Sequence, residues 1–359
     1  MAQKKLIERY LSNKTDSSRR PSFMPVPVFR YTQEIGLEFG IGALYSTYLD
    51  RKDLTNRSSN FSTVLSASTK GQYNISLKGD VWTKQNTHHY IAEVRFKRMP
   101  FDFFGVGNET LEANEDRLIQ GYVKVGLEAE KLLLPHMYTG LSLGFENYHF
   151  TDKEVGGIFT TDQTLIHKVG GSVFYVGVSQ TYDTRNSNNY TTKGFYGKVT
   201  YQYAPDFWGG ENFTGSLIKA NVRNFWSLSP KFVIGVNALF HSVQGKNTPF
   251  YLLQQMSNDE MMRGYYTGRY RERNLLAGQA ELRYRYNNRF GAVIFGGAGQ
   301  VFDNGDLSIK SFKPSYGAGG RYFFDPEKGL SVRVDYGIGE KRANEKRQTG
   351  FYISLAEAF

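Results

Sequence analysis

The chain has 359 residues, of which 15% are aromatic and none is cysteine, and its formal net charge is +10. No apolar run is long enough for a membrane-spanning helix, so a helical membrane protein is excluded. The lack of cysteine excludes a disulfide scaffold and a cysteine metal site. Lysine and arginine are spread along the chain without a basic helix or a nucleic-acid-binding motif, which argues against a nucleic-acid partner.

The N-terminal segment, residues 1–30, is polar and basic and predicts a short periplasmic tail or a plug of a barrel lumen. It contains three prolines, Pro21, Pro25 and Pro27, and lacks the apolar stretch of a signal peptide. A protein that crosses an inner membrane needs such a signal. We therefore expect that the signal has been removed from the sequence shown.

Residues 31–359 have the pattern of one transmembrane β-barrel. Neighbouring side chains of a strand point to opposite faces, and a barrel in lipid needs an apolar outer and a polar inner face. In the clearest strand Ala280, Leu282, Tyr284 and Tyr286 share one face, and Glu281, Arg283 and Arg285 share the other. The mean hydropathy of −0.47 does not argue against this fold, because barrel strands show only alternate residues to lipid.

About fifteen strands are recognisable, and bacterial antiparallel barrels usually close with an even number. We therefore expect an all-β, sixteen-stranded antiparallel barrel, with one strand missed near a long loop. The predicted strands are residues 34–45, 61–68, 72–82, 89–97, 118–129, 137–150, 171–181, 195–203, 213–226, 231–242, 275–286, 290–302, 311–324, 331–338 and 351–359. The tyrosines and phenylalanines fit interfacial girdles, and the positive charge fits contact with outer-membrane lipids and lipopolysaccharide.

Residues 261–274 are too polar for a membrane wall and are rich in arginine and tyrosine. Two interpretations are open from the residues alone. The segment folds back into a polar lumen, where a buried arginine needs a carboxylate, or it is a basic extracellular loop that meets lipopolysaccharide phosphates.

The last strand supports a barrel that runs to the end of the chain. Its residues Phe351, Ile353, Leu355 and Phe359 share one face, and Tyr352, Ser354, Ala356 and Ala358 share the other. Glu357 falls on the outward face, which is tolerable only near an interface. We therefore expect the strand to end at the membrane edge and interpret Phe351, Tyr352, Ile353, Leu355 and Phe359 as a C-terminal strand signal.

The segment Met262-Arg263-Gly264-Tyr265 resembles the Val-Arg-Gly-Phe/Tyr motif of the BamA/TamA superfamily (bacterial surface antigen family), outer-membrane barrels of protein assembly and translocation. Further segments are similar to family segments in the same order: 104–108, 182–186, 193–194, 332–337 and 350–359. The resemblance implies that the loop between strands eleven and twelve returns into the lumen. There Arg263, with Gly264 and Tyr265, locks the loop by pairing with Glu281 on the inner wall, a pairing that the polar side of the strand also favours.

Two departures from the family pattern shape the functional hypothesis. Gly297 stands where many members carry a second acidic residue, so the lock rests on Glu281 alone or recruits another carboxylate. The N-terminal periplasmic domains are missing from the sequence, which suggests a partner that supplies them or a different task. We interpret the chain as a component of outer-membrane protein assembly, insertion or translocation, or an accessory subunit with periplasmic or outer-membrane protein partners, and expect a weak seam between its first and last strands.

Two alternatives remain. The first is a passive outer-membrane pore. The second is a lipid hydrolase, because the run from Gly140 to Gly144 matches G-x-S-x-G around Ser142, although that chemistry needs a strand-turn-helix elbow. The histidines show no metal-ligand spacing. The sequence predicts no catalytic residue, no metal site and no cofactor.

Overall fold

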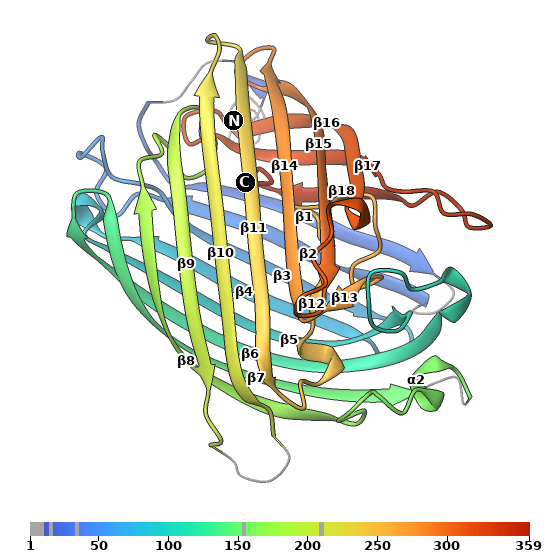
Figure 1. Cartoon of the computed structure of the whole chain (residues 1–359). Helices are drawn as coiled ribbons and strands as arrows, with labels where there is room; N and C mark the ends of the chain where they lie inside the picture. The colour runs from blue at the N-terminus through green and yellow to red at the C-terminus, as the bar shows by residue number, and fades with distance from the viewer. Residues whose placement is uncertain (1–10, 14–16, 33–35, 153–155, 208–211) are drawn as a thin grey trace.

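The computed structural model describes residues 11–13, 17–32, 36–152, 156–207 and 212–359. In this part of the chain sixteen strands form one sheet in which each strand pairs with its neighbour in the sequence (Figure 1). The strands are β1 (Ser22–Thr32), β2 (Gly36–Thr47), β3 (Ser59–Ser68), β4 (Tyr73–Trp82), β5 (His88–Phe103), β6 (Asp116–Leu134), β7 (Met137–Asp152), β8 (Gly170–Asp183), β9 (Gly194–Ala204), β10 (Thr214–Ser227), β11 (Phe232–Lys246), β14 (Asn274–Arg285), β15 (Phe290–Phe302), β16 (Lys313–Asp325), β17 (Leu330–Ile338) and β18 (Thr349–Leu355). The predicted sixteen-stranded antiparallel architecture is confirmed.

The remaining elements are short. A two-residue hairpin, β12 (Gln254–Gln255) and β13 (Arg271–Glu272), lies in the loop between β11 and β14. The helices of the described segments are α2 (Ile158–Thr161), η1 (Lys84–Asn86), η2 (Glu112–Asn114), η3 (Phe250–Leu252) and η4 (Ile309–Ser311). Each has only three or four residues, too few to cross a membrane.

The prediction of a tail over residues 1–30 is wrong at its C-terminal boundary. The missed strand is β1, which pairs with β2 from Ser22 to Thr32, and not a strand near a long loop. Prolines argue against a strand because they lack the N–H donor of the ladder, but an edge strand tolerates them. Pro25 and Pro27 lie opposite Ala43 and Ile41, and β1 has a neighbour in the sheet order on one side alone.

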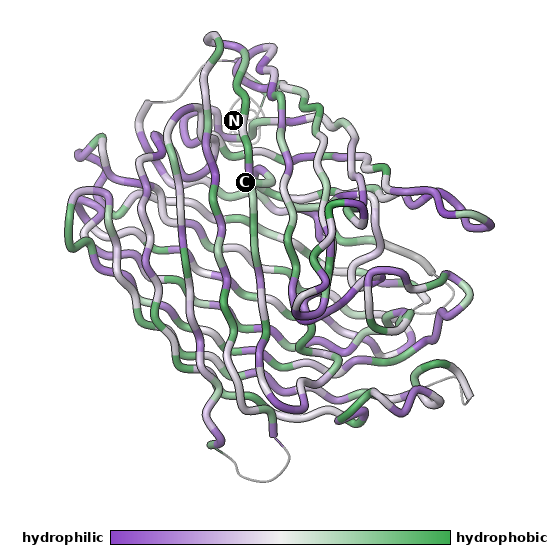
Figure 2. The backbone as a smooth tube through the Cα atoms, in the orientation of Figure 1, coloured by the Kyte–Doolittle hydropathy of each residue, from purple (hydrophilic) through white to green (hydrophobic). Residues whose placement is uncertain are grey.

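The two faces of the sheet differ as a barrel in lipid requires. In β7, Leu141 and Leu143 are 69% and 52% exposed, whereas Ser142 between them is 8% exposed. The same alternation places Glu281 and Arg283 of β14 among the buried residues. Figure 2 shows it as the change of green and purple along successive strands. Apolar side chains therefore cover the outside, and the charged side chains line the lumen.

The first and last strands of the sheet meet at one end. Met24 of β1 and Leu44 of β2 pack in one apolar cluster with Phe324, Leu330 and Leu355 from the C-terminal strands. A polar clasp lies beside this cluster. In it the Lys328 ammonium donates to the backbone carbonyl of Arg20 at 2.6 Å and to the Asp325 carboxylate at 2.9 Å, and the Ser22 hydroxyl donates to Asp325.

The chain leaves the wall after Leu355, which corrects the prediction for Phe359 and Glu357. Ala356 has φ +74°, so the strand alternation ends there. Phe351 and Ile353 keep the predicted outward direction, with exposures of 63% and 59%, but Phe359 is buried inside against Phe225. The turn also keeps Glu357 away from the lipid-facing side of the sheet, and its carboxylate pairs instead with Arg321 at 2.7 Å.

Candidate functional site

The loop between β11 and β14, residues 247–273, lies inside the lumen and is held first by apolar contacts. Its buried side chains pack against one patch of the inner wall formed by β11, β14 and β15. This loop cluster comprises Met256, Met261, Met262, Tyr265 and Tyr270 from the loop and Leu239, Leu275, Ala277 and Val301 from the wall. The sequence predicted a polar lumen, and its alternation of residues gives no sign of this cluster. The only signal was the run of methionines ahead of Arg263.

Gly264 lets the loop approach the wall at the end of β17. Its φ is +114°, and a Cβ atom there would lie 2.7 Å from the carbonyl carbon of Ile338. The wall also has no side chain at this point, since a Cβ on Gly337 would lie 2.5 Å from the backbone of Arg263. Small residues on both sides thus bring the two backbones into direct contact.

Tyr265 and Tyr352 tie the same turn to the neighbouring strands. The Tyr265 hydroxyl donates to the carbonyl of Pro314 at 2.6 Å and accepts from the Glu340 amide at 2.8 Å. The Gly264 amide donates to the Tyr352 hydroxyl of β18 at 2.9 Å. A residue predicted as part of the C-terminal strand signal therefore contacts the loop.

Arg263 lies at the centre of the site, and its side chain is completely buried. One guanidinium nitrogen donates to Glu281 of β14 at 2.5 Å, and another donates to Asp335 of β17 at 2.6 Å. The guanidinium also stacks on the ring of Phe295 in β15, with 3.5 Å to the ring centroid. The structure thus brings the two predicted partners, Arg263 and Glu281, together and adds two contacts that were not predicted by residue.

Asp335 occupies the role that sequence reasoning left open at Gly297. A Cβ at position 297 would lie 2.3 Å from the carbonyl oxygen of Gly278 on the adjacent strand, so an acidic side chain has no room there. Asp335 comes instead from β17, two strands further along the sheet. The lock therefore recruits a second carboxylate from a different strand.

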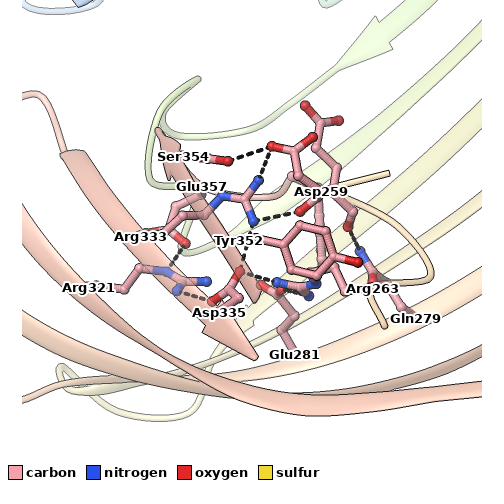
Figure 3. A network of polar contacts seen from close by, with 12 residues as sticks. Asp259, Arg263, Gln279, Glu281, Arg321, Arg333, Asp335, Tyr352, Ser354 and Glu357 are labelled. Atoms are coloured by element: carbon pink, nitrogen blue, oxygen red, sulfur yellow. Dashed lines mark hydrogen bonds and ion pairs between the residues drawn. The ribbon is translucent and has the colours of Figure 1, made fainter. Parts of the chain in front are cut away.

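The contacts of Arg263 belong to a larger charged network that Figure 3 shows from close by. Its ion pairs are Arg283 with Glu281 at 3.0 Å, Arg321 with Asp335 at 2.6 Å and with Glu357 at 2.7 Å, and Arg333 with Asp335 at 2.8 Å and with Asp259 at 2.7 Å. The Ser354 hydroxyl of β18 adds a 2.6 Å hydrogen bond to Asp259. Four arginines and four carboxylates make this lock network neutral, and with Ser354 it joins the loop, four strands and the C-terminal segment.

The other sequence candidates lack the surroundings that chemistry would need. Ser142 lies in the middle of β7, which continues to Asp152 without the turn and helix of a nucleophile elbow. In the described segments no three His, Asp or Glu side chains gather so that they could hold a metal ion. The structure offers no elbow that would support the hydrolase interpretation.

The fold and the site define a transmembrane β-barrel whose lumen is occupied by an inward loop fixed through an arginine lock. Residues 170–359, more than half of the chain, match the Omp85 superfamily domain, and the chain belongs to this family of outer-membrane barrels. The match confirms the family predicted from the sequence. It includes β8 to β18 and thus the whole lock network.

Solved structures with the same fold include BamA from Haemophilus ducreyi lacking POTRA domains 1–3. It shares 13% identity and a TM-score of 0.58, over 94% of this chain and 70% of that chain. CdiB from Acinetobacter baumannii shares 11% identity and a TM-score of 0.55, over 94% of this chain and 60% of that chain. No curated protein matches the sequence.

Proposed function

We propose that this protein handles other polypeptides at the outer membrane, in the assembly and insertion of outer-membrane proteins or in translocation, without catalysing a chemical reaction. Its partners would be outer-membrane lipids, lipopolysaccharide and periplasmic or outer-membrane proteins, and accessory-subunit status is part of the same proposal. The family membership and the likeness to BamA and CdiB support this class of function.

The observation that carries the proposal is the connection between the lumen loop and the end of the sheet. Asp259 of the loop accepts a hydrogen bond from Ser354 of β18, and the Gly264 amide donates to Tyr352 of β18. Arg321 of the lock network pairs with Glu357, which follows β18 in the chain. Any movement of the last strand therefore disturbs the loop, and any object entering the lumen disturbs the last strand. Such a connection would serve a barrel that opens for polypeptides, and a passive pore would have no use for it.

The test is depletion of the protein in its native bacterium, followed by quantitative proteomics of the outer membrane and the culture medium. We expect the loss of a defined set of outer-membrane or secreted proteins and their recovery with the native gene. The Arg263→Ala variant should recover less than the control Arg285→Ala, because Arg285 lies outside the lock network: its guanidinium donates to the carbonyl of Asn288 and stacks on the ring of Phe323. An unchanged protein content on depletion would reject the proposal.

Single-channel conductance separates this proposal from the passive pore. The buried loop cluster predicts a small or flickering conductance for the native protein, which rises when Arg263→Ala releases the loop. A large, steady native conductance would favour the pore.

A further inference from the structure

A cavity of about 520 Å³ lies in the lumen between the inner wall of β5–β7, the loop and β18. Aromatic rings make up much of its lining, among them Phe101 and Phe150 of the wall and Tyr265 and Tyr266 of the loop. Its charged lining residues are Lys97 and Arg271, and no aspartate or glutamate of the described segments lines it. The cavity is therefore aromatic and positively charged.

Arg271 differs from the other arginines of the loop. Arg263 has two carboxylates, Arg269 pairs with Glu345 at 2.9 Å, and Arg273 pairs with Asp303 at 3.3 Å. Among the described residues no carboxylate lies within ion-pair distance of Arg271, although its side chain is 1% exposed. Its guanidinium donates to the Gly268 carbonyl at 3.0 Å and 3.3 Å and lies 4.9 Å from the ring centroid of Phe103.

This arrangement leaves a buried positive charge incompletely compensated. Burial lowers the pKa of Arg271 to about 10, so the side chain stays charged at neutral pH. Aromatic faces and a neutral carbonyl offset only part of the desolvation that a buried cation suffers. A carboxylate in the cavity would supply the missing partner and could bind the guanidinium through two parallel hydrogen bonds.

We propose that the cavity binds a short polypeptide segment in which an acidic side chain lies next to aromatic or apolar side chains, with the carboxylate on Arg271. The inference rests on the proposed function for the origin of the segment, though not for the binding itself. The aromatic lining fits the apolar side chains, and the amides of Gln120 and Gln255, which also line the cavity, fit a peptide backbone. The volume of the cavity lies in the range of binding sites for drug-sized ligands. It is large enough for a few amino-acid residues and too small for a lipid with several acyl chains.

The experiment compares two peptides that differ at one residue, acetyl-Gly-Phe-Glu-Phe-Gly-amide and its twin with glutamine in place of glutamate. Calorimetry measures their affinity for the full chain in detergent micelles. We expect the glutamate peptide to bind about tenfold more tightly or better, because a charge-assisted hydrogen bond exceeds a neutral one. Arg271→Gln should abolish this preference, since glutamine can still donate to Gly268 but carries no charge. Arg285→Gln, a change to an arginine that does not line the cavity, should retain it.

A second variant keeps the test decisive if Arg271→Gln does not fold. Gln120→Trp fills the cavity from β6 without altering Arg271, and it should weaken both peptides at least tenfold. Equal affinity of the two peptides for the native chain would overturn the proposal. Binding of lipopolysaccharide that depends on Arg271, without binding of the glutamate peptide, would also overturn it and assign the cation to a lipid phosphate.

The two proposals fail separately. If depletion leaves the outer-membrane and secreted proteins unchanged while the glutamate peptide still binds through Arg271, the proposed function falls and the site stands. If depletion removes client proteins and neither peptide binds, the cavity inference alone falls.

Discussion

Replacement of Arg263 by alanine removes the centre of the lock network while leaving the wall of the barrel intact. The change deletes hydrogen bonds of 2.5 Å to Glu281 and 2.6 Å to Asp335, and it removes the cation from the face of Phe295. The Arg263 carbonyl still accepts the hydrogen bond from the Ser315 hydroxyl. The variant therefore tests the side chain and not the backbone path of the loop.

The expected loss of stability follows from burial. Arg263, Glu281 and Asp335 all have completely buried side chains, and removal of one partner from a buried ion pair costs about 3–5 kcal/mol. Glu281 retains Arg283, and Asp335 retains Arg321 and Arg333. Because no carboxylate is left without an arginine, we expect the lower part of that range, about 3 kcal/mol.

The structure also supplies a compensating change. In Arg263→Ala combined with Asp335→Asn, three arginines remain with three carboxylates: Arg283 with Glu281, Arg321 with Glu357 and Arg333 with Asp259. The double variant is again neutral. It should be more stable than the sum of the two single effects allows, by about 0.5–3 kcal/mol, the range of coupling within one ion-pair network.

Urea unfolding of the barrel in lipid vesicles measures these free energies, and thiol labelling measures the loop. The native chain has no cysteine, and Met261 is 3% exposed, so a single Met261→Cys substitution reports release of the loop. Labelling should be slow in the native background and fast with Arg263→Ala. Strict additivity of the two single variants, or slow labelling after loss of Arg263, would refute the lock.

Three further predictions concern glycines and the serine of the wall. Gly264→Ala should release the loop and destabilise the barrel by about 1–3 kcal/mol, because φ is +114° and the Cβ would strike Ile338. The control Gly305→Ala, with φ +92° in open space, should bring only the backbone strain. Urea unfolding of both variants measures the difference. Gly297→Asp should destabilise the barrel because its Cβ would meet the Gly278 carbonyl at 2.3 Å; unchanged unfolding would show that this wall has room for the acid. Ser142→Ala should leave any esterase activity of the purified protein unchanged, and a loss of activity would revive the hydrolase alternative.

Much of the fold could be predicted because a barrel wall repeats one simple rule. Alternation of apolar and polar residues located every strand of the wall from β2 to β11 and from β14 to β18, and the polar side of β14 placed Glu281 in the lumen. The inward loop and the pairing with Arg263 came from the resemblance to the BamA/TamA superfamily, and electrostatics agreed with it because a buried guanidinium needs a carboxylate. The wall therefore followed from local pattern, whereas the lock needed the family motif as well.

The parts that could not be predicted depend on contacts between distant segments. Nothing in the alternation of β17 distinguishes Asp335 as the second partner of Arg263, since its role is set by a loop 72 residues away. The buried methionines of the loop look like ordinary loop residues until Leu239 and Val301 provide an apolar patch for them. Phe359 fits the outward alternation by position, and only the turn at Ala356 carries it into the lumen.

β1 was missed for a reason that bears on the seam of the barrel. Alternate residues of a strand direct their N–H and C=O groups to the same edge. Because the pairing with β2 is continuous and proline has no N–H, the nitrogens of Pro25 and Pro27 must face the edge of β1 away from β2. Met24 and Leu355 pack in one cluster, so that opposite edge is the one beside β18. Any ladder between β1 and β18 therefore lacks two donors on the β1 side. Contacts such as the clasp around Lys328 then help to join the ends of the sheet, and this supports the weak seam that the sequence predicts.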